Sequence, residues 1–537
     1  MTTSIDCDKP FNHKKQGSNK VIVIGLDSAD PNLVEHWMEE GRLPFLKSLV
    51  SQGIMARVSS IASGFSDAPW LSFYTGVRPG KHGCYNFLEM NRESREIFRT
   101  NATLCPFPPF WSLLRSTEKK VGIFDVPKTY PIEGLDGIQI SAWGEEYPLI
   151  KACSLPKNLL AEITSRFGRY EHPREILNPR LIFQQVRRYR KLMSAIKQKL
   201  KAVKFVMSQE NSWDLFMTSF GEAHYANHLF YHLWDRSHWA YNSELGNKLG
   251  EALPNIYSKL DSAVKTLLED VPEDVTVLIV SVHGVSTNYS ANHLMPEILE
   301  KLGFQANVGS QSSDSKLSSN TLLQSLRDFV PMPIRDFIND WIVPQSFHDK
   351  SHSQQFISSI DWHNTRAFFL PLGHFQAFVS INLKGRDPYG TVEPEDYQQI
   401  CREITDELKC LVNPDTGKPA VHDVIQISEI LEGERLYQLP DLIIKWAEDV
   451  PINKLHHPKF GLISGEYYGL RKTQHTGNGF VIAKGKHINQ GIDISNIRAI
   501  DLPPTILYLM GQPIPEYMEG RVLFELISNN LKTNSKA

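Results

Sequence analysis

The chain of 537 residues is long enough for one large α/β domain with insertions or for two to three domains. Its apolar fraction of 41% and charged fraction of 22% are those of an ordinary globular protein. The formal net charge of −3 gives no overall attraction for nucleic acid or for an anionic membrane, so no nucleic acid is expected as a stable partner. No stretch of about 18 uninterrupted apolar residues predicts a membrane span.

The chain ends and the cysteines indicate a cellular location. Residues 1–19 and 531–537 are polar and are predicted to be disordered, and the first of these segments lacks the apolar core of a signal peptide. The six cysteines are scattered and form no C-x-x-C pair, which argues against a zinc ribbon or a disulfide framework. A reducing cytoplasm is the expected location.

Apolar runs that alternate with helical patterns predict the fold class. The run VIVIGLD at 21–27 is apolar without interruption, which is typical of a central parallel strand buried on both faces. Further apolar stretches lie at 54–61, 120–126, 214–220, 275–282, 441–446 and 479–483, and residues 367–383 alternate like strands. Helices are predicted at 32–53, 179–207, 254–269, 397–411 and 500–511. This order predicts an α/β fold: a doubly wound, mostly parallel sheet with helices on both faces.

The domain prediction follows from the irregular stretches between these elements. Residues 140–180 show no clear period, residues 305–320 form a Ser-rich loop, and residues 321–355 have a helical pattern typical of a lid. We therefore expect one domain over 20–530, with cap insertions at about 140–210 and 285–360 that select the substrate.

Two polar residues next to these elements have alternative roles. Ser66 stands just before the segment DAPW, a pattern typical of a helix N-terminus. Its hydroxyl either caps this helix or serves as a metal-activated nucleophile beside free backbone N–H groups. Asp27 is either a turn or N-cap residue ahead of a proline, or a site residue at the C-terminal edge of the sheet.

The predicted helix at 179–207 is strongly basic. We interpret its charges as a solvated helix face, because acidic residues elsewhere balance them, and an anion or nucleic-acid patch is the alternative. The basic residues are Arg187, Arg188, Arg190, Lys191, Lys197, Lys199, Lys201 and Lys204.

Four histidines lie near the ends of predicted elements. A single histidine is usually an ordinary core or surface residue, so it is their shared position that points to a site. His224 and His228 are four residues apart, which places both on one face of a helical turn, as zinc sites require. His283 follows an apolar strand directly, and His475 lies on a loop. Imidazoles together with one carboxylate, Asp27, suit Zn²⁺ or a similar first-row ion better than Mg²⁺ or Ca²⁺.

Eight segments carry a resemblance to a known family. They are VIVIGLD at 21–27, APWLSFYTGVRPGKHG at 68–83, VPKTYP at 126–131, WDLFMTSFGEAH at 213–224, DWHNTRAFFL at 361–370, INLKGRDPYGTV at 381–392, PDLIIKW at 440–446 and DLPPTILYLMG at 501–511. In this order they resemble the alkaline phosphatase superfamily, in its type I phosphodiesterase/nucleotide pyrophosphatase branch. The resemblance covers about 21–523, and GVRPGKHG and INLKGRDP are its most specific parts.

The resemblance implies roles for individual residues. The family's Ser or Thr nucleophile matches Ser66, which would attack phosphorus and be transiently phosphorylated, activated by a metal ion. The family's first aspartate matches Asp27, and its last ligand histidine matches His475. Its Asp-x-x-x-His pair falls on His224 and His228, so that a histidine replaces the aspartate.

The implied ligands form two metal sites for a divalent transition metal, with zinc expected and one or two ions bound. The first site would consist of His224, His228 and His475 with an open fourth position. The second would consist of Asp27, Ser66 and His283, and it would contain fewer carboxylates than the corresponding site of the family.

The chain departs from the family at the second site. The family pattern Ser-Asp-His-Gly reads Ser281-Val282-His283-Gly284 here. A valine cannot coordinate a metal, so Val282 is expected to weaken this site. Glu222, two residues before His224, is a candidate replacement.

The leading functional prediction is a metal-dependent hydrolase of small-molecule phosphate esters, diesters or nucleotide-like substrates rather than simple monoesters. The fold leaves open a phosphoryl transferase or an enzyme acting on phosphonate or sulfo-esters. The Cys/Ser-x-Pro-x-Arg signature of sulfatases is missing at Ser66, which disfavours that activity. A non-catalytic binding protein that has lost the second metal site is the alternative from another class. The sequence does not determine the oligomeric state.

Overall fold

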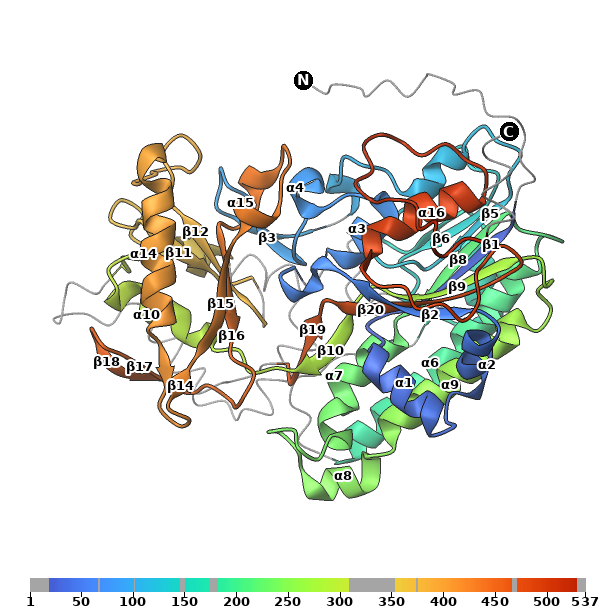
Figure 1. The fold of residues 1–537 in the computed structure, drawn as a ribbon, viewed down its shortest axis with the longest axis horizontal. Helices are drawn as coiled ribbons and strands as arrows, with labels where there is room; N and C mark the ends of the chain where they lie inside the picture. The colour runs from blue at the N-terminus through green and yellow to red at the C-terminus, as the bar shows by residue number, and fades with distance from the viewer. Residues whose placement is uncertain are drawn as a thin grey trace.

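The computed structural model describes residues 19–65, 68–100, 102–144, 150–170, 172, 182–308, 353–372, 375–465 and 471–528. Ser66, the predicted disordered ends, most of the Ser-rich loop and most of the predicted lid at 321–355 lie outside these residues. Figure 1 shows two lobes, a larger one with a central sheet between layers of helices and a smaller one with its own sheet.

The larger lobe is organised around a nine-stranded sheet. Its strands run parallel except β20 and β7, each of which is antiparallel to its neighbours. In order across the sheet they are β21 (Ile497–Arg498), β2 (Ile54–Ser59), β20 (Asn478–Lys484), β9 (Thr276–Ser281), β1 (Val21–Leu26), β8 (Leu215–Phe220), β5 (Val121–Phe124), β6 (Gly137–Ser141) and β7 (Cys153–Leu155). The predicted doubly wound, mostly parallel sheet is therefore confirmed.

β1 is central, as its sequence predicts. It pairs in parallel with β8 on one side and with β9 on the other, and all six of its residues are buried. Its alternate side chains enter two different apolar clusters: Ile22 and Ile24 face one, Val21 and Val23 the other. This two-sided burial explains the uninterrupted apolar run in the sequence.

Helices cover both faces of this sheet (Figure 1). One face packs against α1 (Pro31–Glu39), α2 (Pro44–Ser51), α6 (Ile182–Met207), α7 (Glu222–Trp234) and α9 (Ala252–Leu268), with α8 (Ser243–Leu249) and α5 (Leu159–Phe167) beside them. The other face packs against α3 (Pro69–Thr75) and α16 (Leu502–Leu509). The single helix predicted at 32–53 is wrong, because Gly41, with φ of 77°, and Pro44 separate α1 from α2.

The smaller lobe contains strands that the sequence pattern assigned to the central sheet. β11 (Ala367–Leu370), β12 (Ala377–Ile381), β16 (Leu442–Trp446) and β15 (Val421–Gln426) form a separate antiparallel sheet in this order. β11 and β12 are joined by a short connection, which suits an antiparallel pair, whereas a parallel pair needs a long crossover. α10 (Met295–Lys301) and α14 (Tyr397–Lys409) cover one face of this sheet.

The other face of the smaller sheet packs against the segment that flanks Ser66. Phe65 and Tyr85 lie 6.2 and 5.9 Å, between ring centroids, from Phe378 of β12. Phe65 and Ala68 are both fully buried in this contact. The two lobes therefore meet at the segment that begins the strongest family motif.

A two-stranded ribbon completes the connection between the lobes. β10 (Gly284–Thr287) follows β9 almost directly and pairs antiparallel with β19 (Thr473–Thr476). The remaining short elements are β3 (Leu88–Met90), β4 (Ile97–Arg99), β13 (Val412–Asn413), β14 (Lys418–Pro419), β17 (Lys454–His457), β18 (Gly461–Ser464), α4 (Pro79–His82) and α15 (Ile427–Ile430). No described helix has the length and apolar content that crossing a bilayer requires.

The basic helix α6 is not uniformly solvated. Arg188 and Lys199 are only 5% and 3% exposed, and the Nζ of Lys199 lies 2.7 Å from Oδ2 of Asp125, just after β5. The prediction of a solvated face is wrong for these two residues, because α6 packs along the sheet and one side of it must face the core. Arg187, Arg190, Lys197 and Lys201 are exposed, as predicted.

Candidate active site

The N-terminal half of α7 presents two of the four predicted histidines. β8 ends at Phe220 and α7 begins at Glu222, so the helix starts at the C-terminal edge of the sheet. His224 and His228 are one turn apart, with ring centroids separated by 4.7 Å. The four-residue spacing therefore places both rings on one face, as the sequence indicates.

The β10–β19 ribbon brings in the other two. His283 lies directly before β10, and His475 is paired with Val285 across the ribbon. Their ring centroids are 4.6 Å apart, and His475 lies 4.9 Å from His224. Residues nearly 200 positions apart in sequence thus meet because β19 folds back on the strand that follows β9.

The potential metal ligands form two overlapping groups. In the first, the ligand atoms of His224, His228 and His475 lie within 4.8 Å of one another, and in the second those of Asp27, His224 and His283 do so. His224 belongs to both groups, whereas the sequence reasoning placed it in one only. Asp27 is the sole carboxylate in either group of described residues.

The first group has the spacing that a shared ion would need. Nε2 of His228 and Nε2 of His475 are 3.2 Å apart. Two nitrogen ligands at about 2.0–2.1 Å from one tetrahedral ion are about 3.3–3.4 Å from each other. The donor set and this spacing therefore fit a tetrahedral metal ion with an open fourth position.

A hydroxyl orients the His228 ring. Nδ1 of His228 lies 2.6 Å from Oγ1 of Thr473, so Nε2 is the nitrogen that faces His475. Burial, together with the positive charge of Arg471, lowers the pKa of His228 well below its ordinary value. The ring is accordingly neutral, which is the form that binds metal.

Asp27 extends from the end of β1 toward two of the histidines. Its carboxylate lies 3.5 Å from Nδ1 of His224 and 3.7 Å from Nε2 of His283, and it accepts a hydrogen bond of 2.6 Å from Nε1 of Trp70. The N-cap of α1 is Asp30, whose side chain accepts from two backbone N–H groups. The alternative that Asp27 caps this helix is therefore wrong.

The surroundings of Val282 and Glu222 explain why the second group has few carboxylates. Val282 is fully buried in the same apolar cluster as Val280 and Trp70. Glu222 lies in neither ligand group; its Oε1 accepts a hydrogen bond of 2.8 Å from the hydroxyl of Tyr170, and burial raises its pKa. The structure does not bring Glu222 to the histidines as a replacement carboxylate.

Ser66 and Asp67 lie outside the described residues, but their neighbours are described. α3 starts at Pro69, its N-cap is Ala68, and no side chain of a described residue caps it. The helix ends at Gly76, which has φ of 72°, as expected. The helix therefore begins two residues later than the sequence pattern indicates, and both roles of Ser66, helix cap and nucleophile, stay predictions.

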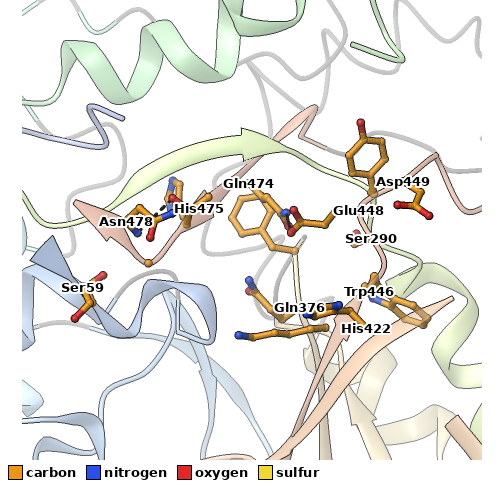
Figure 2. A pocket seen from close by; sticks show the side chains of 16 residues that line it. Ser59, Ser290, Gln376, His422, Trp446, Glu448, Asp449, Gln474, His475 and Asn478 are labelled. Atoms are coloured by element: carbon orange, nitrogen blue, oxygen red, sulfur yellow. Dashed lines mark hydrogen bonds between the residues drawn. The ribbon is translucent and has the colours of Figure 1, made fainter. Parts of the chain in front are cut away.

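A pocket of about 600 Å³ opens beside His475 and spans both lobes. Figure 2 shows His475 and Asn478 at one end of it, with Trp446, Glu448 and Asp449 toward the other. Its remaining lining residues are Ser59, Ser60, Tyr289, Ser290, Phe375, Gln376, His422, Lys445, Gln474, Thr476 and Gly477. A small organic molecule fits a pocket of this size.

Sequence reasoning missed several residues that shape the site. Thr473 could have been found, because it stands two residues before His475 on the same face of a strand. Phe375, whose ring centroid lies 5.3 Å from that of His475, and Trp70, which holds Asp27, gave no such signal. The role of Phe375 depends on how the two lobes meet, and that of Trp70 on how α3 packs against the end of β1.

Comparisons with known proteins identify the family of this chain. The family model described as type I phosphodiesterase / nucleotide pyrophosphatase matches residues 21–459. No curated protein sequence gives a significant match. Among solved structures, phosphonoacetate hydrolase from Sinorhizobium meliloti 1021 in complex with phosphonoformate is 13% identical, with a TM-score of 0.46 and coverage of 92% of this chain and 95% of its own. The human ectonucleotide pyrophosphatase / phosphodiesterase 5 is 10% identical, with a TM-score of 0.45 and coverage of 95% and 100%. Because the family model spans most of the chain, this protein belongs to the type I phosphodiesterase/nucleotide pyrophosphatase family, a family of phospho-ester hydrolases.

Proposed function

We propose that this protein hydrolyses small-molecule phosphate esters with the help of a divalent transition metal ion. The ion, which we expect to be zinc, is held by His224, His228 and His475. The observation that carries the proposal is the 3.2 Å separation of the two Nε2 atoms of His228 and His475. Three imidazole ligands suit a borderline ion such as zinc, and the fourth position stays available for a substrate oxygen.

Ser66 is proposed as the nucleophile. Trp70, four residues further along, donates to Asp27, so the helix that follows Ser66 in the sequence contacts the second ligand group. A bound metal ion supplies Lewis acidity, which lowers the pKa of a hydroxyl near it. The Ser66 oxygen then forms a bond to phosphorus while the bond to the leaving oxygen breaks, and water hydrolyses the phosphoserine in a second step.

We further propose that one ion binds tightly and a second only weakly. The first group contains three ligands, whereas the second shares His224 with it and contributes only Asp27 and His283 of its own. One carboxylate offsets little of the repulsion between two divalent cations a few ångströms apart. With valine at 282, the second ion lacks the anion that would hold it.

The pocket beside His475 supports diesters or nucleotide-like substrates over simple monoesters. A phosphate alone needs far less than about 600 Å³, so the pocket has room for an organic group. Phe375 and Tyr289 offer aromatic surface to such a group, and Lys445 offers a positive charge. Of the predicted cap segments, 285–360 contributes Tyr289 and Ser290 to this pocket.

A reducing compartment such as the cytoplasm is also part of this proposal. Five of the six cysteines lie among the described residues, and all five are free thiols. Cys84, Cys105 and Cys401 are buried, so they behave as small apolar residues of the core.

The test compares bis-(p-nitrophenyl) phosphate with p-nitrophenyl phosphate as substrates of the zinc-loaded protein. We expect nitrophenol release from the diester, faster than from the monoester, and its loss in Ser66→Ala with unchanged zinc content. Ser208→Ala, an exposed serine that lines neither this pocket nor the ligand groups, is the control and should retain activity. Turnover that survives in Ser66→Ala would exclude the phosphoserine route, and a protein without any turnover would favour the non-catalytic alternative.

A further inference from the structure

A second concave surface lies between α5 and α6, apart from the histidine site. It is a groove of about 650 Å³ at the C-terminal end of α5 and along the second half of α6. Of the described residues, those that line it include four cations and no carboxylate. They are Arg166, Phe167, Gly168, Arg169, Tyr170, Ser194, Lys197, Gln198 and Lys201.

Hydrogen bonds fix the walls of this groove. α5 ends at Phe167, and Gly168, with φ of 80°, closes the helix through a bond from its N–H to the carbonyl of Thr164. The side-chain amide of Gln198 on α6 donates to the carbonyls of Phe167 and Arg169, at 2.7 and 3.0 Å. The turn after α5 is thereby tied to α6.

One of the cations is also held in place. The guanidinium of Arg166 lies 4.5 Å from the centroid of the Phe205 ring, and it pairs with Glu162 at 2.7 Å. A guanidinium that is positioned in advance loses less rotamer freedom when it meets an anion. The groove therefore has fixed geometry as well as positive charge.

The other three cations are not neutralised. Arg169, Lys197 and Lys201 form no ion pair with any residue that the structure describes. Their mutual repulsion adds to the free energy of the empty groove, and a bound anion would relieve it. This local excess of positive charge runs against the chain's formal net charge of −3.

We propose that this groove binds a small polyanion that carries two or more phosphate, sulfate or sulfonate groups. Arginine binds such groups through two N–H donors, and lysine binds them as a point charge. Arg166 and Arg169, from the end of α5, and Lys197 and Lys201, from α6, line the same groove. The volume lies in the range of small-ligand pockets. A nucleic acid is disfavoured, because Arg187 and Arg190, in the first half of the same helix, do not line the groove.

One residue that lines the groove also contacts the helix that contains two of the site histidines. Tyr170 lines it, and the hydroxyl of Tyr170 donates to Glu222, the first residue of the helix that contains His224 and His228. The proposal nevertheless stands apart from the hydrolase function, because no predicted ligand or nucleophile lines the groove.

The test is isothermal titration calorimetry of the full chain with 1,3,6-naphthalenetrisulfonate, whose sulfonates a phospho-ester hydrolase does not cleave. We expect one binding site, and a loss of affinity of about tenfold or more in Lys197→Ala/Lys201→Ala. The matched control is Arg187→Ala/Arg190→Ala, which removes the same charge from exposed positions of the same helix and should retain the wild-type affinity. Lys197→Arg/Lys201→Arg should bind like the wild type.

Three results would overturn the proposal. The first is an absence of binding to wild-type protein whose circular dichroism spectrum shows a folded chain. The second is an equal loss of affinity in the groove variant and in the control variant, since this would indicate only general charge attraction. The third is a single-stranded oligonucleotide that binds more tightly than the trisulfonate and depends on both pairs, since this would indicate an extended nucleic-acid surface.

Discussion

Nε2 of His228 and Nε2 of His475 lie 3.2 Å apart, and Thr473 contacts the opposite nitrogen of the His228 ring. Two buried imidazoles in this arrangement either share one proton or share one metal ion. The hydroxyl of Thr473 turns the ring so that the same nitrogen is presented in both cases.

Thr473→Val should therefore weaken metal binding without altering the shape of the strand. We expect the affinity for zinc to fall by about 10- to 100-fold, as is usual when the partner of a ligand histidine is lost. Competition with a chromophoric chelator measures this. Thr476→Val, on the same strand, is the control, and an equal loss of affinity there would show that the hydroxyl of Thr473 has no special role.

Val282→Asp should restore the binding of a second ion and should lower the stability of the protein without metal. A carboxylate at this fully buried, apolar position destabilises the fold without metal, by about 1–3 kcal/mol or more. Excess zinc should raise the melting temperature of the variant more than that of the wild type, and the bound zinc should increase by one ion per chain. Val280→Asp, buried in the same cluster two residues earlier, should be destabilised without gaining zinc. A Val282→Asp protein that behaves like this control would contradict the proposed second site.

Lys199→Met should destabilise the protein strongly, because it leaves the buried carboxylate of Asp125 without its partner. Burial acts against the charge, but Asp125 and Glu222 hold the pKa of Lys199 above its ordinary value. Loss of one member of such a pair costs about 3–5 kcal/mol in the free energy of unfolding, measured by chemical denaturation. The exposed neighbour Lys197→Met should change it by less than about 0.5 kcal/mol.

A double variant separates the loss of the pair from the loss of packing. In Lys199→Met/Asp125→Asn neither member of this ion pair is charged, and asparagine tolerates the φ of 53° at this position. It should be more stable than Lys199→Met alone. Additive losses in the double variant would show that the two residues do not interact.

His82, in the GVRPGKHG motif, should make the fold sensitive to acid. Its Nδ1 accepts the N–H of Cys84, and its Nε2 lies 2.9 Å from the hydroxyl of Ser72. Burial, with a contribution from Arg435, lowers the pKa of His82 from 6.5 to about 3. Below pH 6.5 the unfolded chain binds a proton at His82 that the folded chain excludes, so stability is lost as the pH falls.

Comparing the wild type with His82→Gln at each pH separates the contribution of His82 from those of the other histidines. The difference in free energy of unfolding between wild type and variant should shrink by about 1.4 kcal/mol per pH unit between pH 6.5 and about pH 4. Denaturant titrations at several pH values measure it. A difference that stays constant over this range would mean that His82 is not held neutral.

Local pattern was sufficient for the central strands and for the pair on α7. β1 has an apolar residue at nearly every position because both of its faces are buried, and His224 and His228 share a face because of helical periodicity. These features depend only on neighbours in sequence. The family model confirms the resemblance that was drawn from the motifs.

What the sequence did not predict depends on contacts between distant segments. The strands β11, β12 and β16 have the composition of core strands, and nothing in them indicates that they form a second sheet. Lys199 has the periodicity of a surface lysine, and only the packing of α6 against the end of β5 buries it. The sharing of His224 between two ligand groups likewise depends on how Asp27 and His475 meet across the sheet edge.

The most direct test of the central claim is the metal content of the purified, dialysed protein, measured by elemental analysis. We predict about one zinc ion per chain in the wild type and less than a tenth of that in His475→Ala, with Gln474→Ala as the neighbouring control that keeps its ion. A wild-type protein that retains no transition metal, or a His475→Ala variant that retains as much as the wild type, would contradict the proposed metal site.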